Sequence, residues 1–294
     1  MLDLVVPETV NPMPIKDFLR SHVGLSLTVW RKIKFSGAIL VNGKEIPITH
    51  FIAPGDVIAI NWLQPCDIIP TKIPLHIVYE DDALLIIDKP PGMLVHPTTS
   101  ERLETVGNAV MYYFQQENLP FKFHPVHRLD RNTSGLLVIA KFPHIQHLLS
   151  VNGVKNINRQ YVALITGTLQ PAIGTIDAPI ARHPNSIIQR IVSSEGQQAT
   201  TCYKVLKGLK NASLVELTLL TGRTHQIRVH LSHIGHPILG DDLYGGSRDL
   251  ISRQALHASS LSFTHPNSGK LIEVSSPLPT DIKSVINFLS VDKI

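Results

Sequence analysis

The sequence predicts an α+β protein, and three observations support this class. Hydrophobic residues make up 43% of the 294 residues and charged residues only 17%, which is typical of a compact globular chain. From about residue 73 onward, short apolar segments with strand character alternate with amphipathic helical segments. In the first part of the chain, Asn42-Gly43 separates two short apolar runs, which is a strong signal for a β-hairpin.

The composition argues against several classes of protein. The formal net charge of +4 permits a polyanionic partner without requiring one. Cys66 and Cys202 are far apart and form no CxxC pattern, which argues against a disulfide framework and a zinc ribbon. The N-terminal residues lack the basic and apolar regions of a signal peptide, and no run of about 18 apolar residues predicts a membrane span. We therefore expect a cytoplasmic protein without membrane contact.

Two domains are expected. Residues 1–62 form the first, residues 63–72 form a proline-rich linker, and residues 73–294 form the second. The elements expected in the first domain are helices within residues 14–23 and 26–37, the hairpin around Asn42-Gly43, and a tight turn at Pro54–Asp56.

The second domain is expected to be rich in strands. An apolar segment interrupted by Asp81-Asp82 predicts two short strands, and the continuous apolar run near residue 138 predicts a buried strand. The complete set of expected strands lies within residues 76–90, 135–141, 159–167, 197–208 and 212–222, the last two as a meander pair. Helices are expected within residues 105–118 and 224–235, the latter with Ile227, Leu231 and Ile234 on one stripe.

The segment HPVHRLDRNTSGLLVIAK, residues 124–141, places a single carboxylate at the entry to the predicted buried strand. Asp130 lies between Arg128 and Arg131, and nearby positive charge typically lowers the pKa of a carboxyl group by roughly 1–3 units. An ionised carboxylate suits a nucleophile or a base better than a general acid. The alternative is a structural ion pair at the start of the strand.

A second polar cluster lies in residues 219–246. Arg223, His225, Arg228 and His230 are expected at or near the start of a helix, where donors and the positive end of the helix dipole favour phosphate. The alternative is a solvated basic face.

Metal and cofactor sites are not expected. The histidines at 225, 230, 233 and 236 match no standard ligand spacing and no cysteine joins them, so we expect no metal. The sequence contains neither the GxxxxGK[ST] nor the GxGxxG motif, which gives no basis for a nucleotide cofactor.

Taken together, four segments resemble the RluA-type RNA pseudouridine synthases. HRLDRNTSGLLVIAK is similar to the central motif of that family, and DKPPGMLVHP, RQYVALITG and LTGRTHQIRVHLSHIGHPILGDDLYG are similar to its other motifs. They occur in the family's order across about residues 73–279. The segments AILVNGKEI and PGDVIAI resemble the small S-four-like RNA-binding domain that many members carry. The resemblance implies an α+β catalytic domain with a mixed, largely antiparallel sheet and a central RNA-binding cleft, preceded by a small α/β RNA-binding domain.

The resemblance also implies roles for individual residues. Asp130 matches the essential aspartate, Arg228 the arginine that pairs with it, and Tyr161 the tyrosine that packs against the target base. Arg128 matches an arginine that fills the space left by the flipped nucleotide, and Leu256 is a weaker candidate for the apolar residue beneath the uracil. Further residues expected to contact substrate are His127, Leu129, Thr133, Arg223, His225 and Gln226, and those expected to contact RNA from the first domain are Arg31, Lys32 and Lys34. Arg131 occupies a variable position of the motif, so no role is assigned to it.

The implied reaction converts uridine in RNA to pseudouridine, an isomerisation that needs no cofactor. The expected substrate is structured RNA, with large-subunit ribosomal RNA preferred over transfer RNA by analogy with members that carry the first domain. Asp130 acts either as a nucleophile or as the base that removes the 2′ proton, and the sequence does not choose between these. Alternatives are a non-catalytic RNA-binding or ribosome-assembly protein and a glycosidase, which would usually need two carboxylates. We expect a monomer.

Overall fold

The structure is a computed structural model. It describes residues 2–25, 27, 30, 31, 33, 38–61, 67–150 and 157–290. Most of the helix expected within residues 26–37 lies outside these ranges.

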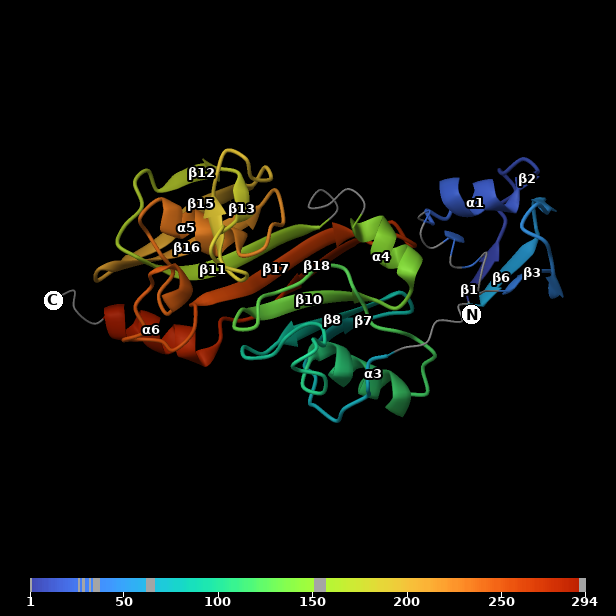
Figure 1. Ribbon diagram of the computed structural model, residues 1–294. Coiled ribbons are helices and arrows are strands. Elements are labelled where there is room, and N and C mark those ends of the chain that lie inside the picture. Colours follow the sequence, from blue (N-terminus) through green and yellow to red (C-terminus); the bar gives the residue numbers. More distant parts are fainter. Residues whose placement is uncertain are drawn as a thin grey trace.

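The N-terminal part contains a four-stranded antiparallel sheet and the helix α1, drawn in blue in Figure 1. Its elements are β1 (Leu2–Val5), β2 (Met13–Pro14), α1 (Ile15–Ser21), β3 (Ala38–Val41), β4 (Lys44–Glu45), β5 (Phe51–Ile52) and β6 (Val57–Asn61). The strand order is β1-β6-β3-β4, and β2 pairs with β5 separately. The predicted hairpin is present, because Asn42 and Gly43 join β3 to β4 with φ values of 52° and 78°. Ile15, Phe18 and Leu19 bury one face of α1, as their helical spacing predicts.

The main part of the chain is built on one large sheet. Its strands are β7 (Ile77–Glu80), β8 (Leu84–Lys89), β9 (His124–Pro125), β10 (Ser134–Ala140), β11 (Asn158–Thr166), β12 (Ile173–Asp177), β15 (Thr200–Leu209), β16 (Ala212–Leu219), β17 (Leu256–Thr264) and β18 (Leu271–Ser275). They follow the order β12-β15-β16-β11-β17-β10-β8-β7, with β18 beside β17 and β9 beside β10. A separate ribbon consists of β13 (Ile180–Arg182) and β14 (Arg190–Val192). The β15–β16 meander and the split between β7 and β8 confirm the predictions for these segments.

One parallel pair joins the two halves of this otherwise antiparallel sheet. Ser134 and Gly135 of β10 lie beside His257 and Ala258 of β17. Gly135 has φ +110°, and a Cβ atom there would lie 2.2 Å from the carbonyl oxygen of Ala258. Only glycine therefore permits this close approach of the two strands. The junction brings the turn ahead of β10, which contains Asp130, next to the start of β17, where Leu256 lies.

Helices cover both faces of the sheet. They are α3 (Val106–Gln116), α4 (Pro143–Ser150), α5 (Gln226–His233) and α6 (Thr280–Ser290), and Asp242–Tyr244 form a short 3₁₀ helix labelled η2. Alternate residues of β10 face opposite ways: Leu137 and Ile139 join the core that includes α3, whereas Leu136 and Val138 pack with α4. Figure 1 shows α3 below β7 and β8 and α4 above β10.

The N-terminal part has its own hydrophobic core. The buried residues of that core run from Val6 to Ile60, whereas the buried residues of the two largest clusters in the main part of the chain begin at Ala83. The exact domain boundaries at residues 62 and 73 stay a prediction. Among the described helices, none is long and apolar enough to cross a membrane.

Candidate active site

Asp130 lies in a tight turn that three donors hold in place. The backbone N–H of Thr133 donates to the carbonyl oxygen of Asp130 at 3.1 Å and closes the turn. The Lys89 ammonium, at the end of β8, donates to the carbonyl oxygen of Arg131 at 2.9 Å. The Arg253 guanidinium donates to the carbonyl oxygen of Asn132 at 3.0 Å. Successive carbonyl groups of residues 130–132 are therefore fixed, which restricts the position of the carboxylate.

The two cations that hold the turn are themselves buried and anchored. Lys89 is fully buried and also donates to the carbonyl oxygens of Pro90 and Met93, at 2.7 and 3.0 Å. Burial lowers the pKa of Lys89 to about 7, against the opposing effect of the Asp130 charge. Arg253 forms a bidentate pair with Asp281 of α6, at 2.7 and 3.0 Å.

Arg228 connects Asp130 to a second, more deeply buried carboxylate. Its Nη1 donates to Oδ2 of Asp130 at 3.2 Å, so the predicted pair is present. Its Nε and Nη2 donate to the two carboxylate oxygens of Asp241, at 2.7 and 2.8 Å. The side chain of Asp241 is 1% exposed, whereas that of Asp130 is 20% exposed. Asp241 thus fixes the guanidinium from behind, and Asp130 keeps a face that is open to the cleft.

The charge of Arg228 is secured by these contacts. Burial opposes the charged form, but the hydrogen bonds and negative charge of Asp241, together with the charge of Asp130, raise the pKa of Arg228 above its ordinary value. The guanidinium also lies 4.9 Å from the centre of the Tyr244 ring, a cation–π distance.

His225 approaches Asp130 from the N-terminal side of α5. It has a left-handed backbone conformation with φ 57°, and its Nε2 is 3.9 Å from Oδ1 of Asp130. Its Nδ1 is 2.8 Å from the hydroxyl group of Tyr244, which accepts a hydrogen bond from the backbone N–H of Arg190. Burial lowers the pKa of His225, although the Asp130 charge opposes this effect. If Nδ1 of the neutral His225 ring accepts a hydrogen bond from the Tyr244 hydroxyl, the ring carries its proton on Nε2, and this N–H is directed toward Asp130.

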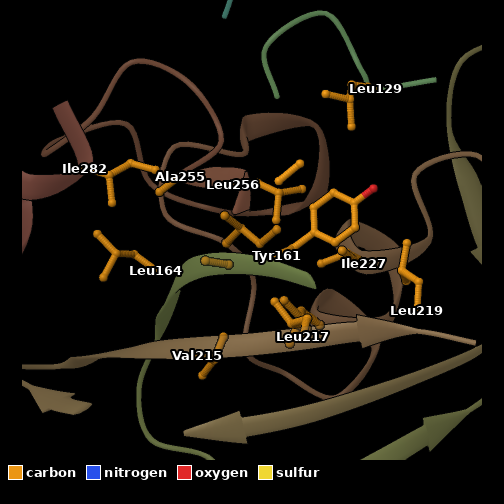
Figure 2. Packing of buried hydrophobic residues seen from close by; sticks show 14 of the residues in the cluster. Leu129, Tyr161, Leu164, Val215, Leu217, Leu219, Ile227, Ala255, Leu256 and Ile282 are labelled. Atoms are coloured by element: carbon orange, nitrogen blue, oxygen red, sulfur yellow. The ribbon is translucent and has the colours of Figure 1, made fainter. Parts of the chain in front are cut away.

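An apolar floor lies next to this charged cluster. Tyr161 is on β11, directly after a register shift in the pairing with β17, and such bulges redirect side chains. Figure 2 shows its ring near Leu256 and Ile227, with the hydroxyl group directed away from the deeper residue Val215. Burial raises the pKa of Tyr161, so the phenol stays neutral at physiological pH.

The charged cluster and the apolar floor line one cleft of about 490 Å³. Arg128, Arg159 and Arg223 contribute guanidinium groups, and Arg128 is exposed. The cleft therefore offers a carboxylate, an apolar platform and a cationic rim, which is the set of groups needed to hold a base and its charged backbone. The predicted residues that line it are His127, Arg128, Leu129, Asp130, Thr133, Tyr161, Arg223, His225, Gln226, Arg228 and Leu256.

The side chains of three predicted residues, His127, Thr133 and Gln226, form hydrogen bonds with other groups of the protein. The backbone N–H of Val138 donates to Nε2 of His127 at 3.2 Å, and burial lowers the pKa of His127 to about 3. The amide group of Gln254 donates to Thr133 at 3.3 Å. The carboxamide of Gln226 has four protein partners: the Thr221 hydroxyl and the Arg223 backbone N–H donate to it, and it donates to Thr200 and Thr201.

The two arginines that flank Asp130 in the sequence diverge in space. Arg131 turns away from Asp130 and pairs with Glu101 at 2.7 Å, and this agrees with its lack of an assigned role. In the N-terminal part, Arg31 is exposed, whereas Lys32 and Lys34 lie outside the described residues.

The structure adds Lys89, Asp241, Tyr244 and Arg253 to the expected site. Asp241 and Tyr244 lie in the quoted motif GDDLYG, but nothing in their spacing indicates that they contact Arg228. In the sequence, the one indication of a role for Lys89 is that this charged residue ends a strongly apolar predicted strand. No group of three or more histidine, cysteine, aspartate or glutamate side chains is placed to hold a metal within the described ranges.

Comparison with known proteins identifies the family. The family model described as RNA pseudouridylate synthase matches residues 83–233. The chain is 37% identical to an uncharacterized RNA pseudouridine synthase of Bacillus subtilis, over 93% of this chain and 98% of that protein. It is 41% identical to ribosomal large subunit pseudouridine synthase D of Haemophilus ducreyi, over 76% of this chain and 73% of that protein. The solved structure of human RNA Pseudouridylate Synthase Domain Containing 1 is 29% identical and has a TM-score of 0.59, covering 76% of this chain and 90% of that chain. The chain belongs to the RNA pseudouridine synthase family and, within it, to the RluA-type enzymes.

Proposed function

We propose that this enzyme isomerises uridine to pseudouridine in large-subunit ribosomal RNA and that Asp130 is its essential catalytic group. The observation that carries the catalytic assignment is the Asp130–Arg228–Asp241 arrangement beside the Tyr161 platform. Arg228 keeps Asp130 oriented and favours its ionised form, because a buried carboxylate without a partner would tend to take up a proton.

The proposed reaction starts with cleavage of the bond between N1 of uracil and C1′ of ribose, and the bonding electrons leave with the uracil. Asp130 then either forms an ester bond to C1′ or removes the proton on C2′. The uracil turns, and C5 bonds to C1′ as the ester bond to Asp130 breaks or as the C2′ proton returns. Loss of the C5 proton and gain of a proton at N1 complete an isomerisation with no net redox change.

Access of a stacked uridine to this cleft requires the nucleotide to flip out of the RNA. Flipping costs a few kcal/mol, which stacking on an aromatic side chain partly offsets. Tyr161 and Leu256 would form the platform for the flipped base. Arg128 is exposed at the rim and is the proposed substitute for the base in the vacated stack.

The ribosomal substrate is supported by relatives named ribosomal large subunit pseudouridine synthase D, including those from Haemophilus ducreyi and Pasteurella multocida. Pseudouridine mapping of total RNA from cells with and without the gene tests it. Loss of one or more pseudouridines from large-subunit ribosomal RNA is the expected result. Loss confined to transfer RNA would replace the proposed substrate, and an unchanged map would contradict the function. The expected cytoplasmic location and monomeric state stay predictions.

We also propose that residues 1–62 are an S-four-like RNA-binding domain. The separate core from Val6 to Ile60 and the Asn42-Gly43 hairpin are consistent with a small independent unit. Its net charge is weakly positive, so the domain would orient RNA more than it supplies affinity.

Removal of residues 1–62 should weaken RNA binding while leaving the fold of the catalytic domain intact, because the two parts have separate cores. The measurement is a salt titration of RNA affinity, with the thermal unfolding of the truncated chain as the control. If the truncated and full-length chains bind RNA equally at every salt concentration, the domain does not contact RNA.

A further inference from the structure

A second cavity, of about 460 Å³, lies directly beside the catalytic cleft. The turn Gly222–Thr224 lines both spaces, the cleft on one side and this cavity on the other. The rest of its wall comes from β13, the first residue of β14, and the loop residues Glu195–Gln197. None of the roles assigned above uses this cavity, apart from the shared turn.

The cavity is lined by three guanidinium groups and one carboxylate. Arg182 and Arg223 are exposed, and Arg190 is partly buried. Among the residues that the structure describes, no carboxylate lies within 4 Å of any of these three guanidinium groups. Glu195 also lines the cavity without pairing with them. Unneutralised arginines in a concave surface produce a locally positive potential that attracts anions.

Two of the three arginines, Arg190 and Arg223, are held at their positions by hydrogen bonds to the protein. Nε of Arg223 donates to the carbonyl oxygen of Gln198 at 3.0 Å, which directs the outer guanidinium nitrogens away from that anchor. Nη1 of Arg190 donates to the carbonyl oxygens of Ile188 and Gln189, at 3.1 and 3.0 Å. An arginine anchored through one edge keeps other N–H groups available for a ligand, in the planar arrangement that suits phosphate oxygens.

The ribbon that forms the cavity is also connected to the active site. The backbone N–H of Arg190 donates to the Tyr244 hydroxyl at 3.0 Å, and the side chain of Gln189 donates to the carbonyl oxygen of Leu243 at 3.1 Å. Tyr244 contacts both His225 and Arg228. The position of the cavity is therefore fixed relative to Asp130.

We propose that this cavity binds backbone phosphates of the RNA nucleotides that flank the target uridine. The proposal rests on the proposed function, because it takes the catalytic cleft to hold the uridine. An RNA strand that leaves the cleft across the Gly222–Thr224 turn enters the cavity next. Contacts with backbone phosphates increase the affinity and fix the position of the RNA along the protein, but they do not discriminate between base sequences. RNA is favoured over an acidic protein segment because the cavity is continuous with a nucleotide site.

The test compares the variant Arg182→Gln with the matched control Arg248→Gln. Both remove one positive charge, but Arg248 pairs with Asp242 at 3.0 Å and lines neither cavity. The affinities for a fluorescein-labelled oligouridylate and for the trinucleotide UpUpU are measured at several salt concentrations. Loss of one phosphate contact lowers the slope of log affinity against log salt by about 0.7 for single-stranded RNA. The ratio of the wild-type affinity to the Arg182→Gln affinity should therefore decrease by about 2.5-fold between about 50 and 200 mM salt.

The length of the RNA supplies the second criterion. Wild type should bind the oligouridylate more tightly than UpUpU, whose two phosphates can supply only part of the flanking contacts, and Arg182→Gln should lose part of this difference. Arg248→Gln should match wild type in slope and in length dependence. The variant Glu195→Gln, which removes the one acid of the cavity, should bind the oligouridylate more tightly than wild type. Equal salt slopes for Arg182→Gln and Arg248→Gln, or no length dependence in wild type, would overturn the proposal.

A pseudouridine assay separates this proposal from the proposed function. If wild type forms pseudouridine in ribosomal RNA and the binding criteria fail, only the phosphate site is rejected. If the binding criteria hold but wild type forms no pseudouridine, the cavity binds RNA phosphate and the proposed function is rejected.

Discussion

At the scale of single residues, the partner of the central carboxylate is not one of its sequence neighbours. Arg131 pairs with Glu101, and Arg128 extends to the rim of the cleft. The guanidinium that contacts Asp130 belongs to Arg228, which is 98 positions away. Asp241 holds that guanidinium through two oxygens. The charges next to Asp130 in the sequence therefore suggest the wrong ion-pair partner, whereas the resemblance to the family motifs identifies Arg228 as the partner.

The variant Asp241→Asn tests the supporting carboxylate. Arg228 would lose its buried charged partner and keep its contacts with Asp130 and Tyr244. Loss of a buried ionic partner typically costs about 3–5 kcal/mol. We expect the free energy of unfolding to fall by about 3 kcal/mol and kcat to fall roughly 100-fold as the geometry loosens. Urea unfolding and steady-state kinetics provide the measurements. The neighbouring variant Asp242→Asn is the control, because Asp242 forms an exposed pair that contributes at most about 1 kcal/mol. Equal effects of the two substitutions would contradict the assigned role.

Two buried histidines should make the protein sensitive to acid. Burial lowers the pKa of His127 to about 3 and that of His144 to about 4, whereas the unfolded chain has an ordinary value near 6.5. The unfolded state then binds more protons, so stability is lost as the pH falls below about 6.5. The loss is about 1.4 kcal/mol per pH unit for each such histidine, until the pH reaches its folded pKa.

Urea unfolding across pH 4 to 7 measures this dependence. The variant His144→Gln cannot gain the proton, so its free energy of unfolding should fall less steeply with decreasing pH than that of wild type. His233→Gln, at an exposed position of α5, should keep the wild-type slope. A wild-type free energy of unfolding that does not change between pH 7 and 5 would refute the claim.

At the scale of elements, the catalytic turn is held by segments distant in sequence. The end of β8 supplies Lys89, and the approach to β17 supplies Arg253, which α6 anchors through Asp281. Burial would raise the pKa of Asp281, but the hydrogen bonds and charge of Arg253 lower it overall. A helix that lacks direct contact with the cleft therefore helps to position the Asp130 carboxylate.

The variant Asp281→Asn should release Arg253 from this anchor. We expect kcat to fall about tenfold with little change in KM, because the turn is displaced while the substrate contacts remain. The exposed Glu273 of β18 offers a control with the same change in charge, Glu273→Gln, which should behave as wild type. A rise in KM at unchanged kcat would indicate instead that α6 affects substrate binding.

Sequence patterns predicted several elements but few of their pairings. The helical stripe of Ile227 and Leu231 and the continuous apolar run of β10 identified α5 and a buried strand correctly, because burial of one face imposes those periods. Two helices and ten strands were not among the expected elements: α4, α6, β1, β2, β5, β6, β9, β12–β14, β17 and β18. The parallel contact at Gly135 and the Arg253–Asp281 pair depend on tertiary arrangement, which no local period encodes.

At the scale of the whole molecule, the active site lies where the two halves of the sheet meet. One half contributes the Asp130 turn ahead of β10, and the other contributes Tyr161 on β11 and Leu256 on β17. Arg228 completes the site from α5, a helix that follows the far strands in sequence. Folding of both halves is required before the carboxylate, its arginine and the aromatic platform come together.

The most direct measurement is the release of tritium from RNA labelled at uracil C5, compared between wild type and Asp130→Asn. Wild type should release tritium as C5 bonds to the ribose. Asp130→Asn should bind the same RNA with undiminished affinity and release tritium roughly 10²–10⁴-fold more slowly. Release by the variant at the wild-type rate would contradict the central claim that Asp130 carries the reaction.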